Sequence, residues 1–115
     1  MSHSRTQIPP IHSSLASDPL LAELVAEFVA EMPGRVARLR RQLDSQDWVA
    51  LRRTAHQLKG AAGSYGFDPI TPLAHRLEML LAHGVEPKMI ADAVHDLAAH
   101  CQRLTADVPE CDTPE

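Results

Sequence analysis

Apolar residues recur every three or four positions through most of the chain, and prolines and glycines interrupt this pattern at intervals. This spacing is typical of amphipathic helices that bury one face. Glycine is scarce, at 5 of 115 residues, and only 3% of the residues are aromatic. Runs of β-branched and aromatic residues are hard to find, which argues against a β-sandwich or a barrel. The sequence therefore predicts an all-α fold with an aliphatic core.

Prolines, glycines and capping residues divide the chain into five predicted helical segments. The first starts at Asp18 and reaches about Glu31, because Pro33 and Gly34 should break it, and the second continues to about Asp44. The remaining three run from Trp48 to about Tyr65, from Pro69 or Pro72 to Gly84, and from Pro87 to before Pro109. We expect the four later segments to form an antiparallel four-helix bundle (up-down-up-down), with the additional N-terminal helix packed at one end.

The length of the chain and its flanking segments indicate a single helical domain over residues 18–107. Residues 1–17 and 108–115 lack apolar periodicity and are expected to be tails. No apolar run is long enough to span a membrane, and the first residues lack the apolar region of a signal peptide. A cytoplasmic location is expected, with Cys101 and Cys111 reduced.

A metal site is not expected. A zinc site could be drawn from His100, Cys101 and Cys111, but Cys101 falls on the apolar stripe of the last helical segment.

The net charge of −4 conceals a basic segment. Between residues 35 and 59 the acidic residues are Asp44 and Asp47, whereas the basic residues are Arg35, Arg38, Arg40, Arg41, Arg52, Arg53 and Lys59. The segment suggests an anionic partner. A solvated helix face, with arginine stems lying over the core, explains the charge equally well.

His56 should point away from the core. At about 100° per residue, its side chain lies roughly 130° from the centre of the apolar face of the third helical segment. Its neighbours on the same surface are Arg52, Arg53, Lys59, Gly60 and Gly63. A glycine inside a helix costs about 1 kcal/mol relative to alanine. Two of them here suggest a bare strip of backbone along which another protein approaches the imidazole.

A neutral imidazole has a free lone pair on one ring nitrogen and can attack phosphorus. Lys59, with the two arginines one turn earlier, would supply positive charge for a phosphoryl group on His56. No carboxylate lies between Asp47 and Asp68, which argues against a hydrolase with an acid that orients the histidine. Glu78 is interpreted as a solvated or intrabundle charge, with support of the docking face as an alternative. The surface therefore suits a group that other proteins load and unload.

The sequence His56-Gln-Leu-Lys-Gly-Ala-Ala-Gly-Ser-Tyr-Gly-Phe67 resembles the signature of histidine-containing phosphotransfer (HPt) domains. Asp47-Trp48 and Leu77-Glu78 are also similar to that family. The resemblance implies a four-helix bundle with an accessory N-terminal helix, and a phosphocarrier that lacks kinase activity. It implies His56 as phosphoacceptor, Lys59 as the cation near the phosphoryl group and Gly60 as the gap that admits the partner.

The implied partners are the receiver domains of a hybrid sensor kinase and of a response regulator, contacted by a monomer. The chain itself would bind no cofactor, because Mg2+ belongs to the receiver. The expected contact residues are Arg52, Arg53, Gly60, Gly63, Ser64 and Tyr65. For Tyr65, packing at the end of the bundle is the simpler alternative. Neither a membrane nor a nucleic acid is expected as a partner.

Two alternatives remain. A helical module could bind receiver or kinase domains without carrying phosphate. The arginine-rich patch could bind nucleic acid, although it lacks interleaved aromatic residues and a second basic cluster.

Overall fold

The computed structural model describes residues 9–108. Its four helices are α1 (Ala22–Asp44), α2 (Trp48–Ser64), α3 (Ile70–His83) and α4 (Pro87–Cys101). Two-residue strands lie on either side of them, β1 (Ile11–His12) and β2 (Leu104–Thr105). The expectation of a helical fold with an aliphatic core is confirmed.

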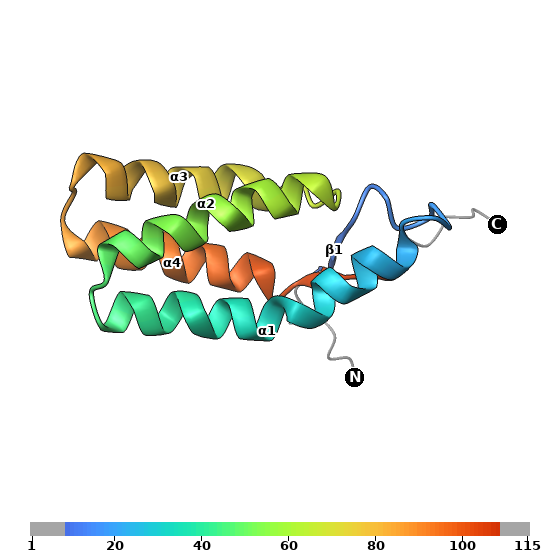
Figure 1. Cartoon of the computed structure of the whole chain (residues 1–115), viewed down its shortest axis with the longest axis horizontal. Helices are drawn as coiled ribbons and strands as arrows, with labels where there is room; N and C mark the ends of the chain where they lie inside the picture. The colour runs from blue at the N-terminus through green and yellow to red at the C-terminus, as the bar shows by residue number, and fades with distance from the viewer. Residues whose placement is uncertain (1–8, 109–115) are drawn as a thin grey trace, which may run out of the picture.

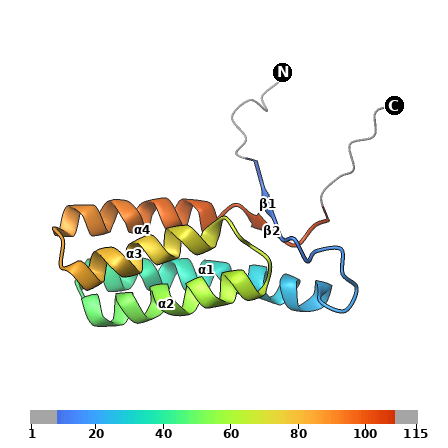
Figure 2. The same ribbon diagram turned by 90° about the horizontal axis from the view of Figure 1, so that it is seen from above.

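Each helix packs against two others, so the four helices enclose one core. α1 contacts α2 and α4, and α3 contacts the same two helices. Figure 1 shows the four helices side by side, with the chain running along the bundle in alternating directions, and Figure 2 shows the same layout from above. The fully buried side chains come from every helix and include Phe28, Leu39, Leu58, Leu77 and Leu97.

The prediction of a separate N-terminal helix is wrong, because α1 continues through Pro33 without a break. Proline in a helix interior removes one hydrogen bond and costs about 3 kcal/mol. Buried residues recur on both sides of it at helical spacing, with Phe28 and Met32 before and Val36 and Leu39 after. Burial of this continuous apolar stripe explains why one long helix is retained.

The helix that carries His56 has the bounds that its sequence predicts. Asp47 caps α2, accepting a hydrogen bond at Oδ1 from the backbone N–H of Ala50 at 3.2 Å. The buried residues of α2 are Leu51, Thr54, Ala55, Leu58 and Ala62. Since these side chains hold one face of the helix against the core, the opposite face is left to solvent.

The predicted end of the fourth helical segment at Gly84 is also confirmed. Gly84 ends α3 in the left-handed conformation, with φ of 67°. α4 starts at Pro87 as expected, but it ends at Cys101 and not just before Pro109. Leu104, which lies within the last predicted helical segment, is instead buried as part of β2.

The segment expected to be an N-terminal tail packs against the bundle from residue 11 onward. β1 pairs in parallel with β2, and the N–H of Ile11 donates to the carbonyl of Arg103 at 2.8 Å. Ile11, Ser13 and Ala16 are buried. Residues 1–8 of the expected N-terminal tail (1–17) and residues 109–115 of the expected C-terminal tail (108–115) lie outside the described residues.

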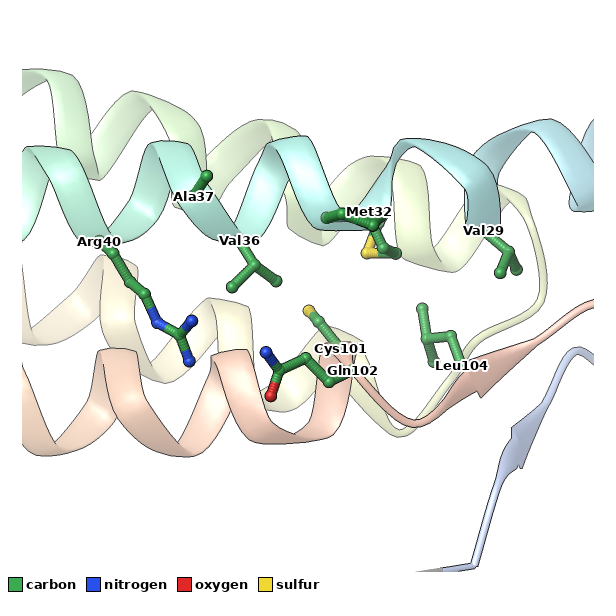
Figure 3. Close-up of a pocket in the computed structure, with 9 residues that line it drawn as sticks. Val29, Met32, Val36, Ala37, Arg40, Cys101, Gln102 and Leu104 are labelled. Carbon is green, nitrogen blue, oxygen red and sulfur yellow. The ribbon is translucent and has the colours of Figure 1, made fainter.

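A largely apolar cleft of about 370 Å³ lies between α1 and the end of α4. In Figure 3 the Arg40 side chain reaches from α1 toward α4, beside Gln102. Among residues 9–108, no helix has both the length and the apolar character needed to cross a bilayer.

Candidate functional site

His56 lies at the middle of α2 on the face opposite the buried residues. Its side chain is 66% exposed. Ala55, directly before His56 in sequence, and Leu58, two residues after it, are buried. The packing of α2 therefore displays the imidazole to solvent, as the helical periodicity predicts.

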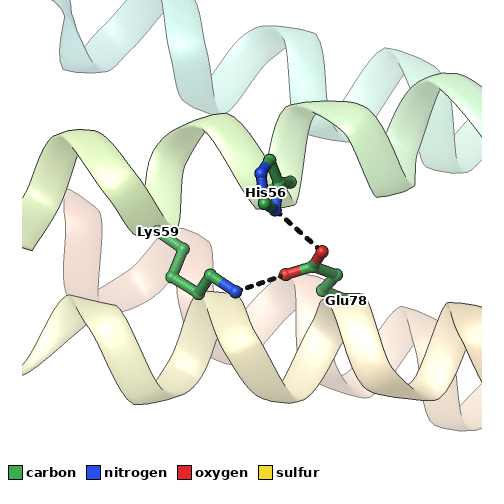
Figure 4. A network of polar contacts seen from close by, with 3 residues as sticks. All are labelled: His56, Lys59 and Glu78. Carbon is green, nitrogen blue, oxygen red and sulfur yellow. Dashed lines mark hydrogen bonds and ion pairs between the residues drawn. The ribbon is translucent and has the colours of Figure 1, made fainter.

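A carboxylate from the neighbouring helix α3 is hydrogen-bonded to one nitrogen of this ring. Nδ1 of His56 lies 2.9 Å from Oε2 of Glu78 on α3, and Nζ of Lys59 lies 2.9 Å from Oε1 of the same carboxylate. Figure 4 shows Glu78 between the other two side chains. The three residues form what we call the His56–Glu78–Lys59 cluster.

The partners of Glu78 are what the interpretation of the sequence missed, although an intrabundle charge was one of the two roles expected for it. The sequence shows no acidic residue on the helix of His56, and we expected Glu78 to be a solvated or intrabundle charge. The packing of α3 on α2 brings its carboxylate to the imidazole, where the Glu78 side chain is only 15% exposed. The signal that could have found it is the Leu77-Glu78 pair: Leu77 faces the core, which places the next residue at the edge of the helix interface.

The electrostatics of the cluster fix the roles of the two ring nitrogens. The Lys59 ammonium holds the pKa of the Glu78 carboxyl below its ordinary value of 4.5; desolvation opposes this shift, and the hydrogen bond with His56 adds to it. An ionised carboxylate can only accept hydrogen bonds, so Nδ1 of His56 must carry the proton. In the neutral ring the lone pair is then on Nε2.

Lys59 is not a free cation in this structure, because it already pairs with Glu78. An ammonium group has three donors, and one carboxylate oxygen occupies only one of them. The Lys59 side chain is 27% exposed. It can therefore hold Glu78 in place and still offer positive charge toward solvent beside the imidazole.

A shallow depression of about 300 Å³ lies beside His56. It is lined by Val49, Arg52, Arg53, His56 and Glu78. Both arginines are exposed, and Val49 is 73% exposed. The structure thus brings two of the expected contact residues to the imidazole, together with an apolar side chain that the sequence interpretation did not single out.

The two glycines expected to form a bare strip differ in their surroundings. A Cβ added at Gly60 would meet nothing within 4 Å, whereas one added at Gly63 would lie 3.7 Å from Oγ1 of Thr71. Gly60 therefore leaves open space on the exposed surface. Gly63 is also exposed, but it stands next to the start of α3.

Ser64 and Tyr65 lie apart from the cluster. They follow His56 by eight and nine residues, which corresponds to about 12–14 Å along a helix. Ser64 is exposed at the last position of α2. The ring of Tyr65 stacks on Phe28, with centroids 4.9 Å apart. Contact of these two residues with a partner stays a prediction.

No group of three or more histidine, cysteine, aspartate or glutamate side chains within residues 9–108 could hold a metal ion. Cys101 is buried, and desolvation raises the pKa of its thiol to about 12. Cys111, which the sequence suggested as a further ligand, is outside the described residues.

A bundle of helices that displays a histidine beside a lysine is the arrangement that the resemblance to phosphotransfer domains led us to expect. The family model for the Hpt domain matches residues 23–108, and the chain belongs to this family. Comparisons with curated proteins and with solved structures gave no match. Hpt domains are phosphocarriers, not kinases, and act in phosphorelays with receiver domains.

Proposed function

We propose that His56 accepts a phosphoryl group from an aspartyl phosphate of one receiver domain and passes it to the aspartate of another. The donor would belong to a hybrid sensor kinase and the acceptor to a response regulator, with the relay operating in the cytoplasm. The observation that carries the proposal is the exposed imidazole of His56. Its Nδ1 is hydrogen-bonded to Glu78, so Nε2 is the ring nitrogen left to react with a partner.

The step needs no proton transfer by this chain. The Nε2 lone pair attacks phosphorus, the phosphorus–oxygen bond to the receiver breaks, and the receiver carboxylate leaves with the electron pair. The new nitrogen–phosphorus bond puts a positive charge on the ring, and Nδ1 keeps its hydrogen. The Glu78 carboxylate stabilises this ring cation, and Lys59 stabilises the phosphoryl oxygens.

The metal ion expected for the transfer is supplied by the receiver. Mg2+ bound there would neutralise the charge that develops on the transferring group. The residues of this chain contribute the nucleophile, its orientation and a cation. Return transfer to a second aspartate is the same reaction in reverse, so one geometry serves both loading and unloading.

Incubation with a receiver domain phosphorylated on its aspartate tests the proposal. The full chain should gain a label that is labile in acid and stable in base, and His56→Gln should gain none. His95→Gln is the matched control, because His95 is an exposed histidine on α4, away from the Lys59–Glu78 pair. If the His56→Gln variant still gains the label, the phosphoacceptor is another residue and the proposal is wrong.

The same experiment separates the proposal from a helical module that only binds receivers. Such a module would bind the phosphorylated receiver and gain no label. The His56–Glu78–Lys59 cluster favours the carrier, because binding alone does not require an exposed imidazole with a fixed tautomer.

A further inference from the structure

The basic segment at residues 35–59 is divided by the fold into groups that face different parts of the molecule. Arg52 and Arg53 stand beside His56. Arg40 faces the cleft between α1 and α4 (Figure 3). Arg35, Arg38 and Arg41 line a second groove, between α1 and α2. The seven basic residues therefore do not act as one patch.

The second groove has a volume of about 600 Å³ and a mainly polar lining. Besides the three arginines, it is lined by Ala30, Glu31, Gly34, Ala37 and Gln57. The groove runs along α1 and reaches α2 at Gln57, the residue that directly follows His56 in the sequence. Gly34 lines the groove with bare backbone, and a Cβ added there would meet nothing within 4 Å, so the space beside it is open.

Only part of the charge in this groove is used within the chain. Arg35 pairs with Glu31 at 3.1 Å and lies over the ring of Phe28, 5.2 Å from its centroid. In the part of the chain that the structure describes, no ion pair involves Arg38 or Arg41, and both are exposed. After the Arg35–Glu31 pair is counted, the groove keeps two positive charges for a partner.

We propose that the groove of Arg38, Arg41 and Gln57 binds a carboxylate-bearing surface element of the receiver domain that exchanges phosphate with His56. This proposal rests on the function proposed above and adds where, and by what chemistry, the partner is held. A receiver that binds Mg2+ must expose carboxylates around its phosphorylation site. Two guanidinium groups beside the phosphoacceptor helix complement that charge.

A receiver fits these observations better than a nucleic acid. A duplex presents a long, regular row of phosphates, and binding it calls for an extended basic surface. Here the groove contains the Glu31 carboxylate at one end, and its free charges are confined to the two arginines. The position of Gln57 next to His56 also ties the groove to the site of transfer.

Charge reversal on one helix provides the test. The variants are Arg38→Glu, Arg41→Glu and the double variant that combines them. Arg40→Glu is the matched control for each single variant, because Arg40 lies between the two arginines in sequence but faces α4. Binding of a phosphorylated receiver domain and the kcat/KM for transfer are measured over a range of salt concentrations. Phosphoramidate, a small donor that needs no docking, measures the reactivity of His56 separately.

The double variant should bind the receiver about tenfold more weakly, with a similar loss in kcat/KM and a shallower dependence on salt. Its labelling by phosphoramidate should match that of the unchanged chain, and Arg40→Glu should change each value less than about twofold. Equal effects of the double variant and the control would overturn the proposal, as would tighter binding of duplex DNA through the same two arginines.

Failure of the proposed function would look different. If the unchanged chain gains no label from either donor, His56 is not a phosphoacceptor, whereas receiver binding still reports on the groove. If the double variant then binds the receiver about tenfold more weakly and Arg40→Glu does not, the groove is a docking site even without phosphotransfer. Unchanged binding of the double variant would overturn the docking proposal.

Discussion

Nδ1 of His56 lies 2.9 Å from Oε2 of Glu78, although the two residues are 22 positions apart in sequence and on different helices. The carboxylate that orients the imidazole thus comes from α3, and Lys59 on α2 pairs with the same carboxylate. The site depends on the packing of two helices as well as on the helix that carries the histidine.

Glu78→Gln should slow transfer without abolishing it. The amide oxygen can still accept the hydrogen bond from Nδ1, but it lacks the negative charge that stabilises the ring cation. Because the site is partly exposed, we expect a loss of about three- to tenfold in the transfer rate. Glu78→Ala should lose more, since it removes the acceptor as well. Rapid-quench transfer assays measure both, and equal rates for all three proteins would contradict the proposed role of Glu78.

The Glu78 carboxyl should titrate below 4.5, and Lys59→Met should raise its pKa, because Lys59 is the largest cause of the shift. NMR of the side-chain carboxyl carbon measures the midpoint. Lys88→Met is the control, because Lys88 pairs with Asp92. A midpoint that is the same with and without Lys59 would exclude this ion pair in solution.

This titration has a consequence for stability. A carboxyl whose pKa is lower in the folded state stabilises the fold at pH values above its unfolded pKa. That contribution is lost as the pH falls through the lower, folded pKa. Lys59→Met should therefore lower the free energy of unfolding at pH 6 more than at pH 3. Urea unfolding at the two pH values gives the comparison, and a larger effect at pH 3 would reverse the predicted sign.

Gly60 should matter for the approach of the partner and not for stability. Gly60→Ala fills open space on a helix and should stabilise the protein by up to about 1 kcal/mol. Gly60→Gln should keep that stability but lower the transfer rate from a receiver, because the longer side chain obstructs the surface beside His56. Thermal unfolding and transfer assays on both variants test this, and full transfer by Gly60→Gln would argue against a bare strip.

Gly66 should be a glycine that the fold requires, for reasons of both backbone conformation and space. Its φ is +81°, and an added Cβ would lie 2.6 Å from Oγ of Ser13. Gly66→Ala should therefore destabilise the protein by about 1–3 kcal/mol. Gly34→Ala, in open space within α1, should stabilise it slightly. Urea unfolding of the pair gives the test, and equal stabilities would show that the segment at residues 13–15 moves aside without cost.

How far the sequence predicts the fold depends on the range of the interaction concerned. The bounds of α2 follow from the Asp47 cap and the apolar spacing, which act within a few residues. The break expected at Pro33 was wrong because burial along all of α1 outweighs a local penalty. The early end of α4 was missed because β2 pairs with β1, about 90 residues away.

For the site, the sequence by itself determined which residue is displayed and what chemistry it can perform. Helical periodicity turns His56 outward, and the residues around it carry the resemblance to the Hpt family. Only the tertiary structure decided that Glu78 orients the imidazole and that Arg38 and Arg41 share a groove while Arg40 faces elsewhere. The reason is physical: a helix sets the direction of its own side chains, but the partner of a side chain on another helix depends on how the two pack.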